Sequence, residues 1–143
     1  LKSKNFNTNF QWSHFLYSDD LPVTRPPWGK IVSLNIVSGD INWEVPSGYI
    51  KDIKIGTSNF GGLLATSGNL IFSTGTNDKK IVALDSSDGE ELWSFNMKAA
   101  GSTAPITFEF NNKQYIAVVS SGGRYHNYTK KYGELYVFSL QSN

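Results

Sequence analysis

The residues of this chain that are best suited to bind a ligand lie in its long polar connections. Asn59 and Asp78 carry groups that exchange hydrogen bonds with a ligand hydroxyl, and His126 titrates near neutral pH. Arg124 adds a permanent positive charge two residues before that histidine. From residue type alone, Asp78 is a candidate acceptor for a ligand hydroxyl and His126 a candidate proton acceptor, and Asn59 and Arg124 lie in the same set of polar connections.

Each candidate also has a simpler structural interpretation. Asp78 follows Asn77 in a short loop, and both residue types commonly hydrogen-bond the backbone of a turn. Gly61 and Gly62 could let a flat cofactor approach the backbone, or they could form a bend that enters a strand. A single histidine in a polar loop, such as His126, is more often solvent-exposed than catalytic. The residue types alone leave these alternatives open.

Composition and spacing exclude several other kinds of chemistry. The chain has no cysteine, which excludes disulfides, thiol catalysis and cysteine metal sites. No group of His, Asp and Glu has metal-ligand spacing, and neither a phosphate-binding loop nor a Gly-x-Ser-x-Gly elbow is present. A net charge of +1 gives no field that would attract nucleic acid. We therefore assign no catalytic residue and no metal ligand within this chain.

A repeated phrase ending in tryptophan indicates how the chain folds. Residues 29–43 and 80–93 share an apolar strand, a turn with glycine and a second strand, and they end at Trp43 and Trp93, 50 residues apart. A repeat of this length containing short strands is typical of propeller blades. We expect each tryptophan to pack between neighbouring blades, with its N–H bonded to a backbone carbonyl.

The period-two alternation of apolar residues predicts an all-β chain without helices. We expect an irregular lead-in with one strand around residues 10–17, a half blade, one complete four-stranded blade and a three-stranded blade. These units cover residues 1–28, 29–45, 62–97 and 103–140, with a long loop over 46–61. The fold class is therefore a β-propeller fragment of about two and a half four-stranded antiparallel blades.

Loop lengths identify the working face of these blades. Antiparallel strands place alternate connections of a blade on opposite faces, and the long connections here all belong to one of them. Those connections are 46–61, 75–79, 98–102 and 121–132. Long loops on a rigid scaffold are where function usually lies, so we expect the site on this face.

Four further strings, together with the tryptophan repeat, carry a resemblance to a known family. They are Pro27-Trp28-Gly29, Gly56-Thr57-Ser58-Asn59-Phe60-Gly61-Gly62, Ala100-Gly101-Ser102-Thr103-Ala104-Pro105 and Lys113-Gln114-Tyr115 followed by Ser121-Gly122-Gly123. In this order they resemble the C-terminal part of membrane-bound quinoprotein glucose dehydrogenases, which depend on pyrroloquinoline quinone (PQQ). The resemblance covers nearly all of residues 26–140.

The resemblance implies a parent eight-bladed propeller that oxidises a sugar or alcohol by hydride transfer to PQQ. It implies that Asn59, Phe60 and Gly61 approach the quinone and that Asp78 faces the cofactor cavity. A calcium or magnesium ion would be held mainly by residues of earlier blades. Arg124 stands where these relatives often have a histidine, with His126 two residues later, so both are substrate-side candidates and glucose itself is in doubt as the substrate.

Our hypothesis is thus a C-terminal part of a quinoprotein sugar or alcohol dehydrogenase, inactive by itself. The resemblance implies a periplasmic location, electron transfer to ubiquinone or a cytochrome, and an export signal or membrane anchor upstream of Leu1. The alternative is a non-catalytic propeller scaffold that binds protein partners. Because terminal blades have uncovered faces and edges, we expect the chain to self-associate, with residues 1–28 supplying a strand within the chain or to a neighbour.

Overall fold

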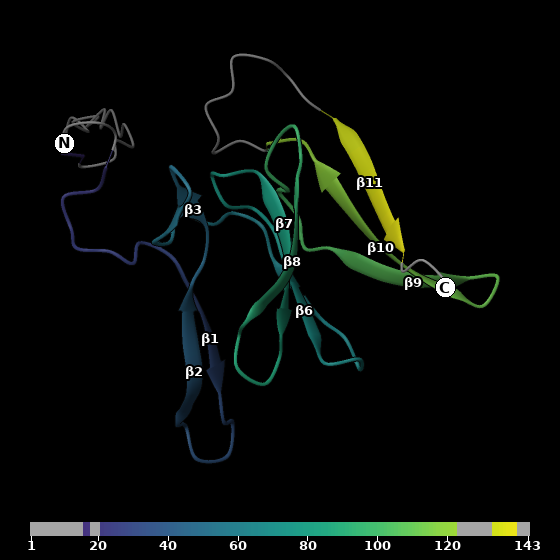
Figure 1. Ribbon diagram of the computed structural model, residues 1–143. Coiled ribbons are helices and arrows are strands. Elements are labelled where there is room, and N and C mark those ends of the chain that lie inside the picture. The colour runs from purple at the N-terminus through teal and green to yellow at the C-terminus, as the bar shows by residue number, and fades with distance from the viewer. Residues whose placement is uncertain (1–15, 18–20, 123–132, 140–143) are drawn as a thin grey trace, which may run out of the picture.

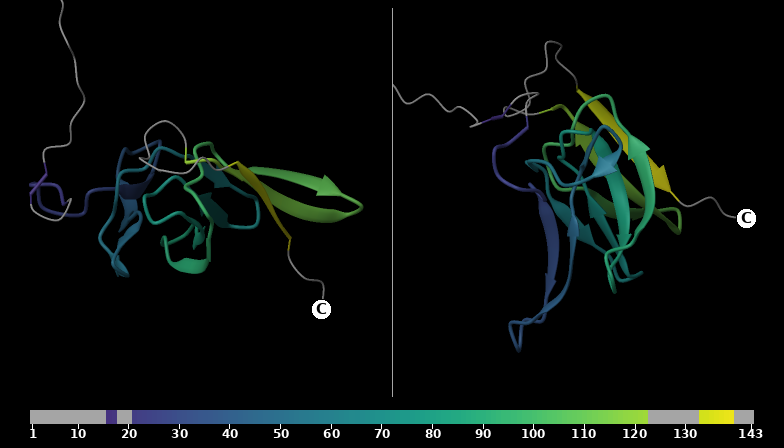
Figure 2. Two further views of the ribbon diagram at one scale, coloured as in Figure 1. Left: turned by 90° about the horizontal axis from the view of Figure 1, so that it is seen from above. Right: turned by 60° about the vertical axis from the view of Figure 1, so that its left-hand side comes forward.

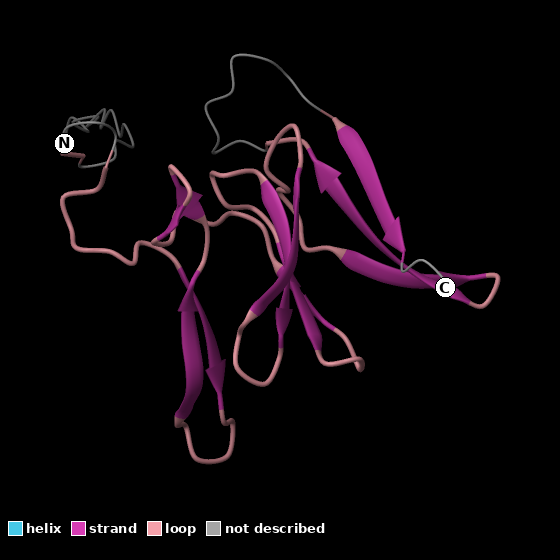
Figure 3. Cartoon of the chain, in the orientation of Figure 1, coloured by secondary structure: helices cyan, strands magenta, loops and turns pink. Residues whose placement is uncertain are grey.

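All regular structure among the described residues of this chain is β-structure. A computed structural model describes residues 16–17, 21–122 and 133–139, and its elements are eleven strands joined by turns and loops (Figure 3). All strand pairings are antiparallel. The predicted all-β fold class is confirmed. None of the described residues forms a helix of the length and apolarity that crossing a membrane requires.

The strands form three blades that stand in a row (Figure 1). Blade 1 is a hairpin of β1 (Lys30–Leu34) and β2 (Ile41–Pro46). Blade 2 is a four-stranded sheet of β5 (Leu63–Ala65), β6 (Leu70–Ser73), β7 (Lys80–Asp85) and β8 (Glu91–Asn96). Blade 3 contains β9 (Ile106–Phe110), β10 (Lys113–Ser120) and β11 (Glu134–Ser139), in the sheet order β11-β10-β9.

The last hairpins of blades 1 and 2 share the same strand register, including one irregularity. Both hairpins shift register at the same place, between Ser33 and Leu34 in blade 1 and between Ala83 and Leu84 in blade 2. Such a bulge increases the local twist of a strand pair. The sequence repeat is therefore a structural repeat in which the turn and bulge are preserved along with the strands.

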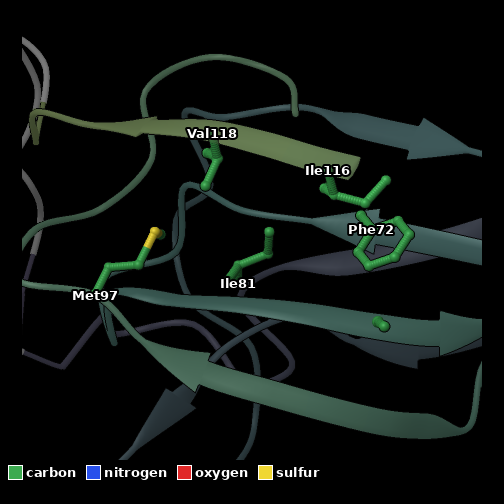
Figure 4. Close-up of a cluster of buried hydrophobic side chains, with 6 residues drawn as sticks. Phe72, Ile81, Met97, Ile116 and Val118 are labelled. Carbon is green, nitrogen blue, oxygen red and sulfur yellow. The ribbon is translucent and has the colours of Figure 1, made fainter. Parts of the chain in front are cut away.

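The main apolar core lies between blades 2 and 3. Phe72, Ile81 and Met97 of blade 2 meet Ile116 and Val118 of blade 3 (Figure 4). Ile81 is fully buried, which corresponds to about 1.5–3 kcal/mol of stabilisation for a branched aliphatic side chain. Alternating apolar residues of β7 and β10 thus pack the two blades against each other face to face, as the period of two predicts.

The segment expected to be one long loop over residues 46–61 contains a small hairpin. Its strands are β3 (Tyr49–Ile50) and β4 (Ile53–Lys54). The turn residues Lys51 and Asp52 both have positive φ, at 48° and 65°. A two-residue turn of this kind usually carries Asn-Gly or Asp-Gly, so Lys-Asp gave no recognisable hairpin signal.

The described end of the lead-in contacts the segment that follows the β3–β4 hairpin. Within its described part, Leu16 forms an isolated bridge with Pro22, and the Trp28 N–H donates to the carbonyl of Ile55. The indole of Trp28 donates to the carbonyl of Thr24. Most of the strand expected around residues 10–17 lies outside the described residues.

Candidate functional site

Three connections from different parts of the chain meet on the predicted working face. The Phe60 N–H donates to the carbonyl of Gly75 at 3.1 Å, and Asn59 forms an isolated bridge with Thr76. The hydroxyl of the fully buried Thr74 donates to the carbonyl of Gly101 at 3.1 Å. We call this meeting point, formed by residues 59–62, 74–76 and 101, the loop junction.

Glycine is required in the loop junction because the backbones touch there. A Cβ atom on Gly61 would lie 2.3 Å from the carbonyl oxygen of Thr74 and 2.7 Å from that of Gly101. A Cβ on Gly75 would lie 2.0 Å from the nitrogen of Gly61, and its φ of 99° further disfavours any other residue. The glycine of the Asn-Phe-Gly-Gly string therefore allows three loops to pack together, whether or not a ligand lies beside them.

The loop junction presents Asn59 and Phe60 at its surface. The Asn59 Oδ1 accepts a hydrogen bond from the Gly61 N–H at 2.8 Å, which leaves its amide nitrogen as the donor that can face a ligand. The Phe60 side chain is 37% exposed. An amide donor beside a half-exposed aromatic ring is a suitable surface for one face of a flat, polar-edged ligand.

Asp78 lies close to the loop junction, but its carboxylate bonds to the protein itself. One oxygen accepts from the Tyr49 N–H at 2.9 Å, and the other accepts from the Thr76 hydroxyl and from the Lys80 N–H. The side chain is partly buried. Asp78 therefore joins the 75–79 loop to the β3–β4 hairpin, the turn-shaping role that the residue type alone suggested. Its contact with a cofactor stays a prediction.

A polar cluster lies next to Asp78, in a small pocket between blades 1 and 2. The Tyr49 hydroxyl donates to Glu91 Oε2 at 2.7 Å, and Lys54 forms an ion pair with the same oxygen at 3.0 Å. The Lys80 ammonium lies 4.0 Å from the centre of the Tyr49 ring, a cation–π distance. We call these four residues the Tyr49 cluster.

Burial and the neighbouring charges set the protonation states within the Tyr49 cluster. Burial, the hydrogen bond to Glu91 and the negative charges of Glu91 and Asp78 raise the pKa of Tyr49 to about 12. Burial alone would raise the pKa of Glu91, but hydrogen bonds from Tyr49 and Lys54 and the nearby lysine charges lower it. The phenol thus stays protonated and the carboxylate ionised at neutral pH. The cluster holds the β3–β4 hairpin against blade 2.

For the remaining residues of the candidate site, the sequence prediction is untested or the sequence did not reveal them. Arg124 and His126 lie outside the described residues, so their position relative to the loop junction stays untested. Tyr49 and Glu91 were not singled out from the sequence, because they lie 42 positions apart and no local pattern pairs them. Among the described residues, no group of three or more acidic or histidine side chains could hold a metal ion.

The predicted inter-blade role is confirmed for Trp43. Its indole N–H donates to the carbonyl of Ser86 in the next blade at 3.0 Å. Trp93 packs edge-on against Phe138 of blade 3, with ring centres 5.1 Å apart.

Comparison with known proteins identifies the family. Residues 2–116 match the model of the PQQ β-propeller domain of glucose, ethanol and alcohol dehydrogenases. The chain is 31% identical to quinoprotein glucose dehydrogenase A of Acinetobacter calcoaceticus over 141 residues, which cover 92% of this chain and 18% of that protein. It is 33% identical to quinoprotein glucose dehydrogenase of Escherichia coli K12, over 76% of this chain and 15% of the relative. The chain therefore spans less than a fifth of the length of these relatives.

A solved structure agrees in fold. The quinohemoprotein alcohol dehydrogenase of Comamonas testosteroni matches 85% of this chain and 18% of its own length, with 25% sequence identity and a TM-score of 0.64. The repeated blades, the glycine-dependent loop junction and the family match agree with one another, and the chain belongs to the family of PQQ β-propeller domains of glucose, ethanol and alcohol dehydrogenases.

Proposed function

We propose that this chain is part of a PQQ-dependent sugar or alcohol dehydrogenase and that its loop junction forms one wall of the quinone pocket. The observation that carries this proposal is the pairing of Asn59 and Phe60 on a surface where three loops meet at glycines that leave no room for a Cβ atom. Bound PQQ would supply the hydride acceptor, while the protein supplies orientation and charge.

The residues of the loop junction fit such a cofactor. Phe60 offers part of its ring to a flat ring system, and Asn59 offers an amide donor to a carbonyl or carboxylate at the edge of that system. Asp78 supports this wall from behind, because it fixes the 75–79 loop on which Gly75 and Thr76 contact the Asn-Phe-Gly segment. In this proposal Gly61 contributes through its backbone.

The remaining parts of the enzyme would come from the rest of the parent protein. We propose an eight-bladed parent in the periplasm, where an upstream segment could anchor it to the inner membrane. A calcium or magnesium ion would be bound mainly outside this chain, and electrons would pass to a quinone or cytochrome acceptor. Arg124 and His126 are the proposed contacts on the substrate side, and they select among sugars and alcohols.

The test uses the complete parent protein, reconstituted with PQQ and calcium and assayed by dye reduction with a panel of sugars and alcohols. We expect turnover, and we expect Phe60→Ala to weaken PQQ binding, measured by quenching of tryptophan fluorescence. Asp88→Ala is the matched control, because Asp88 lies in the turn at the opposite end of β7 and β8. Absence of both PQQ binding and turnover in the complete protein would overturn the proposal, and equal binding by Phe60→Ala and the control would remove the loop junction from it.

The isolated chain gives a second measurement. A ligand pocket normally encloses most of the ligand surface, and a single wall cannot do so. We therefore expect the 143-residue chain to bind PQQ weakly or not at all and to show no sugar oxidation. Robust turnover by the purified chain would contradict the one-wall assignment.

A further inference from the structure

The connection from blade 2 to blade 3 contains a short segment with no side chain larger than a methyl group. Residues 99–101, Ala-Ala-Gly, lie between β8 and β9, and all three are buried. Ala99 and Ala100 have no exposed surface. We call this segment the strap. Because a methyl group makes few contacts, the position of the strap depends on the hydrogen bonds of its backbone.

Ser120 of blade 3 binds the strap at its first residue. The Ser120 hydroxyl donates to the Ala99 carbonyl at 2.7 Å and accepts from the Ala99 N–H at 3.1 Å. The Gly122 N–H donates to the Ala100 carbonyl at 2.9 Å, and Gly101 forms an isolated bridge with Ser120. Ser120 is fully buried, so its hydroxyl has no access to water and depends on these backbone partners. Blade 3 therefore holds the strap along its length.

Thr74 of blade 2 binds the other end of the strap. Its hydroxyl donates to the Gly101 carbonyl at 3.1 Å, and only 1% of the residue is exposed. A Cβ atom on Gly101 would lie 1.9 Å from the Thr74 hydroxyl oxygen, so this contact requires the glycine. Blade 2 lies between blades 1 and 3 in the view from above (Figure 2, left). Buried hydroxyls thus reach the strap from both of the blades that it joins.

Thr74 and the strap together enclose Gly61 of the loop junction. The Thr74 carbonyl oxygen lies 2.3 Å from the position of a Cβ on Gly61, and the Gly101 carbonyl oxygen lies 2.7 Å from it. Gly61 in turn donates its N–H to Oδ1 of Asn59 at 2.8 Å, which fixes the direction of the Asn59 amide. A strap that moves away from Gly61 therefore releases the residue that orients Asn59 and its neighbour Phe60.

We propose that Thr74 and Ser120 are positioning residues of the quinone wall. Their buried hydroxyls hold the strap against Gly61, and Gly61 then orients the amide of Asn59 and the ring of Phe60 toward the cofactor. This role rests on the function proposed above for the loop junction. Neither hydroxyl touches the cofactor, because both are buried and bonded to backbone, so they act on PQQ binding only through the position of the strap.

Substitutions at Thr74 in the complete parent protein separate positioning from general stability. Thr74→Val removes the hydroxyl at nearly constant volume, whereas Thr74→Ser retains it. We expect Thr74→Val to raise the Kd for PQQ about tenfold, measured by quenching of tryptophan fluorescence, because the buried Gly101 carbonyl loses its partner. Thr74→Ser should restore the affinity of the unsubstituted protein.

Thr66→Val is the matched control. It removes a hydroxyl that donates to the Leu70 carbonyl at 3.2 Å, at the opposite end of the same blade. The variants are compared at equal concentrations of folded protein, measured by circular dichroism and thermal unfolding. Equal PQQ binding by folded Thr74→Val and Thr66→Val would overturn the proposal, and so would equal weakening by Thr74→Ser and Thr74→Val. An unsubstituted protein that binds no PQQ would instead overturn the function proposed for the loop junction.

Hydrogen exchange of the PQQ-free protein tests the strap without the cofactor, and it does so even where Thr74→Val does not fold. Ser120→Ala removes both hydroxyl bonds to Ala99. It should speed exchange about tenfold in peptides covering residues 99–101 and 59–62, because local opening of the strap frees Gly61. A peptide covering the distant turn of residues 85–90 should keep its exchange rate. Faster exchange confined to residues 99–101, or unchanged exchange in both peptides, would overturn the proposal while the proposed enzymatic function stands.

Discussion

Alanine substitution at two equivalent glycines separates backbone strain from inter-blade packing. Gly39 and Gly89 occupy the same turn position with nearly equal φ, so alanine incurs the same left-handed strain of about 1 kcal/mol at each. At Gly39 the new methyl group meets nothing within 4 Å, whereas at Gly89 it would lie between 2.8 and 3.0 Å from atoms of Trp43 and Val45. Because the Trp43 indole is bonded to Ser86, the ring cannot move away without losing that hydrogen bond.

The expected magnitudes follow from these contacts. Overpacking of this kind costs typically about 1–3 kcal/mol, so Gly89→Ala should lower the free energy of unfolding by about 2–4 kcal/mol in total. Gly39→Ala should lower it by only about 1 kcal/mol. Both variants are compared with the unsubstituted chain by urea unfolding. Losses that agree within about 0.5 kcal/mol would refute the inference that Trp43 holds blade 1 against the blade 2 turn.

Two further predictions concern the working face. Because the pKa of Tyr49 is raised to about 12, its protonated form stabilises the fold fully below pH 10, and this contribution is lost as the pH rises toward 12. Absorbance titration at 295 nm should show a late phase whose amplitude falls by one tyrosine in Tyr49→Phe, while the hydrogen bond to Glu134 also raises the pKa of Tyr136; an unchanged late amplitude would contradict the cluster geometry. In the complete enzyme, Asp78→Ala should lower PQQ affinity or turnover more than Asp88→Ala, because Asp78 fixes the loop behind the proposed quinone wall and Asp88 bonds only within its own turn. Equal activities of the two variants at matched folded concentration would refute that difference.

Local patterns along the chain determined the blades. The alternation in residues 80–85 and the repeated turn before Trp93 predict strands where the structure has β7 and β8, because alternation directly reports which face of a strand is buried. The inter-blade bond of Trp43 was predictable for the same reason, since a repeated unit must bury the same residue in each copy. The β3–β4 hairpin was not predictable from the sequence, because its Lys-Asp turn lacks the residues usual in such turns and the hairpin is held by contacts from distant parts of the chain.

The partners of individual site residues were decided only by the tertiary structure. Asp78 was identified from the sequence as a candidate, but its bond to the Tyr49 backbone joins residues 29 positions apart, and no local pattern encodes such a pairing. The same holds for Tyr49 with Glu91 and for Thr74 with Gly101, whose contacts exist because antiparallel strands return distant loops to one face. The sequence by itself therefore determined the strands, the turns and the inter-blade tryptophan, which depend on near neighbours. The tertiary structure decided which loops touch and which polar groups are already satisfied, because those contacts depend on how the blades pack.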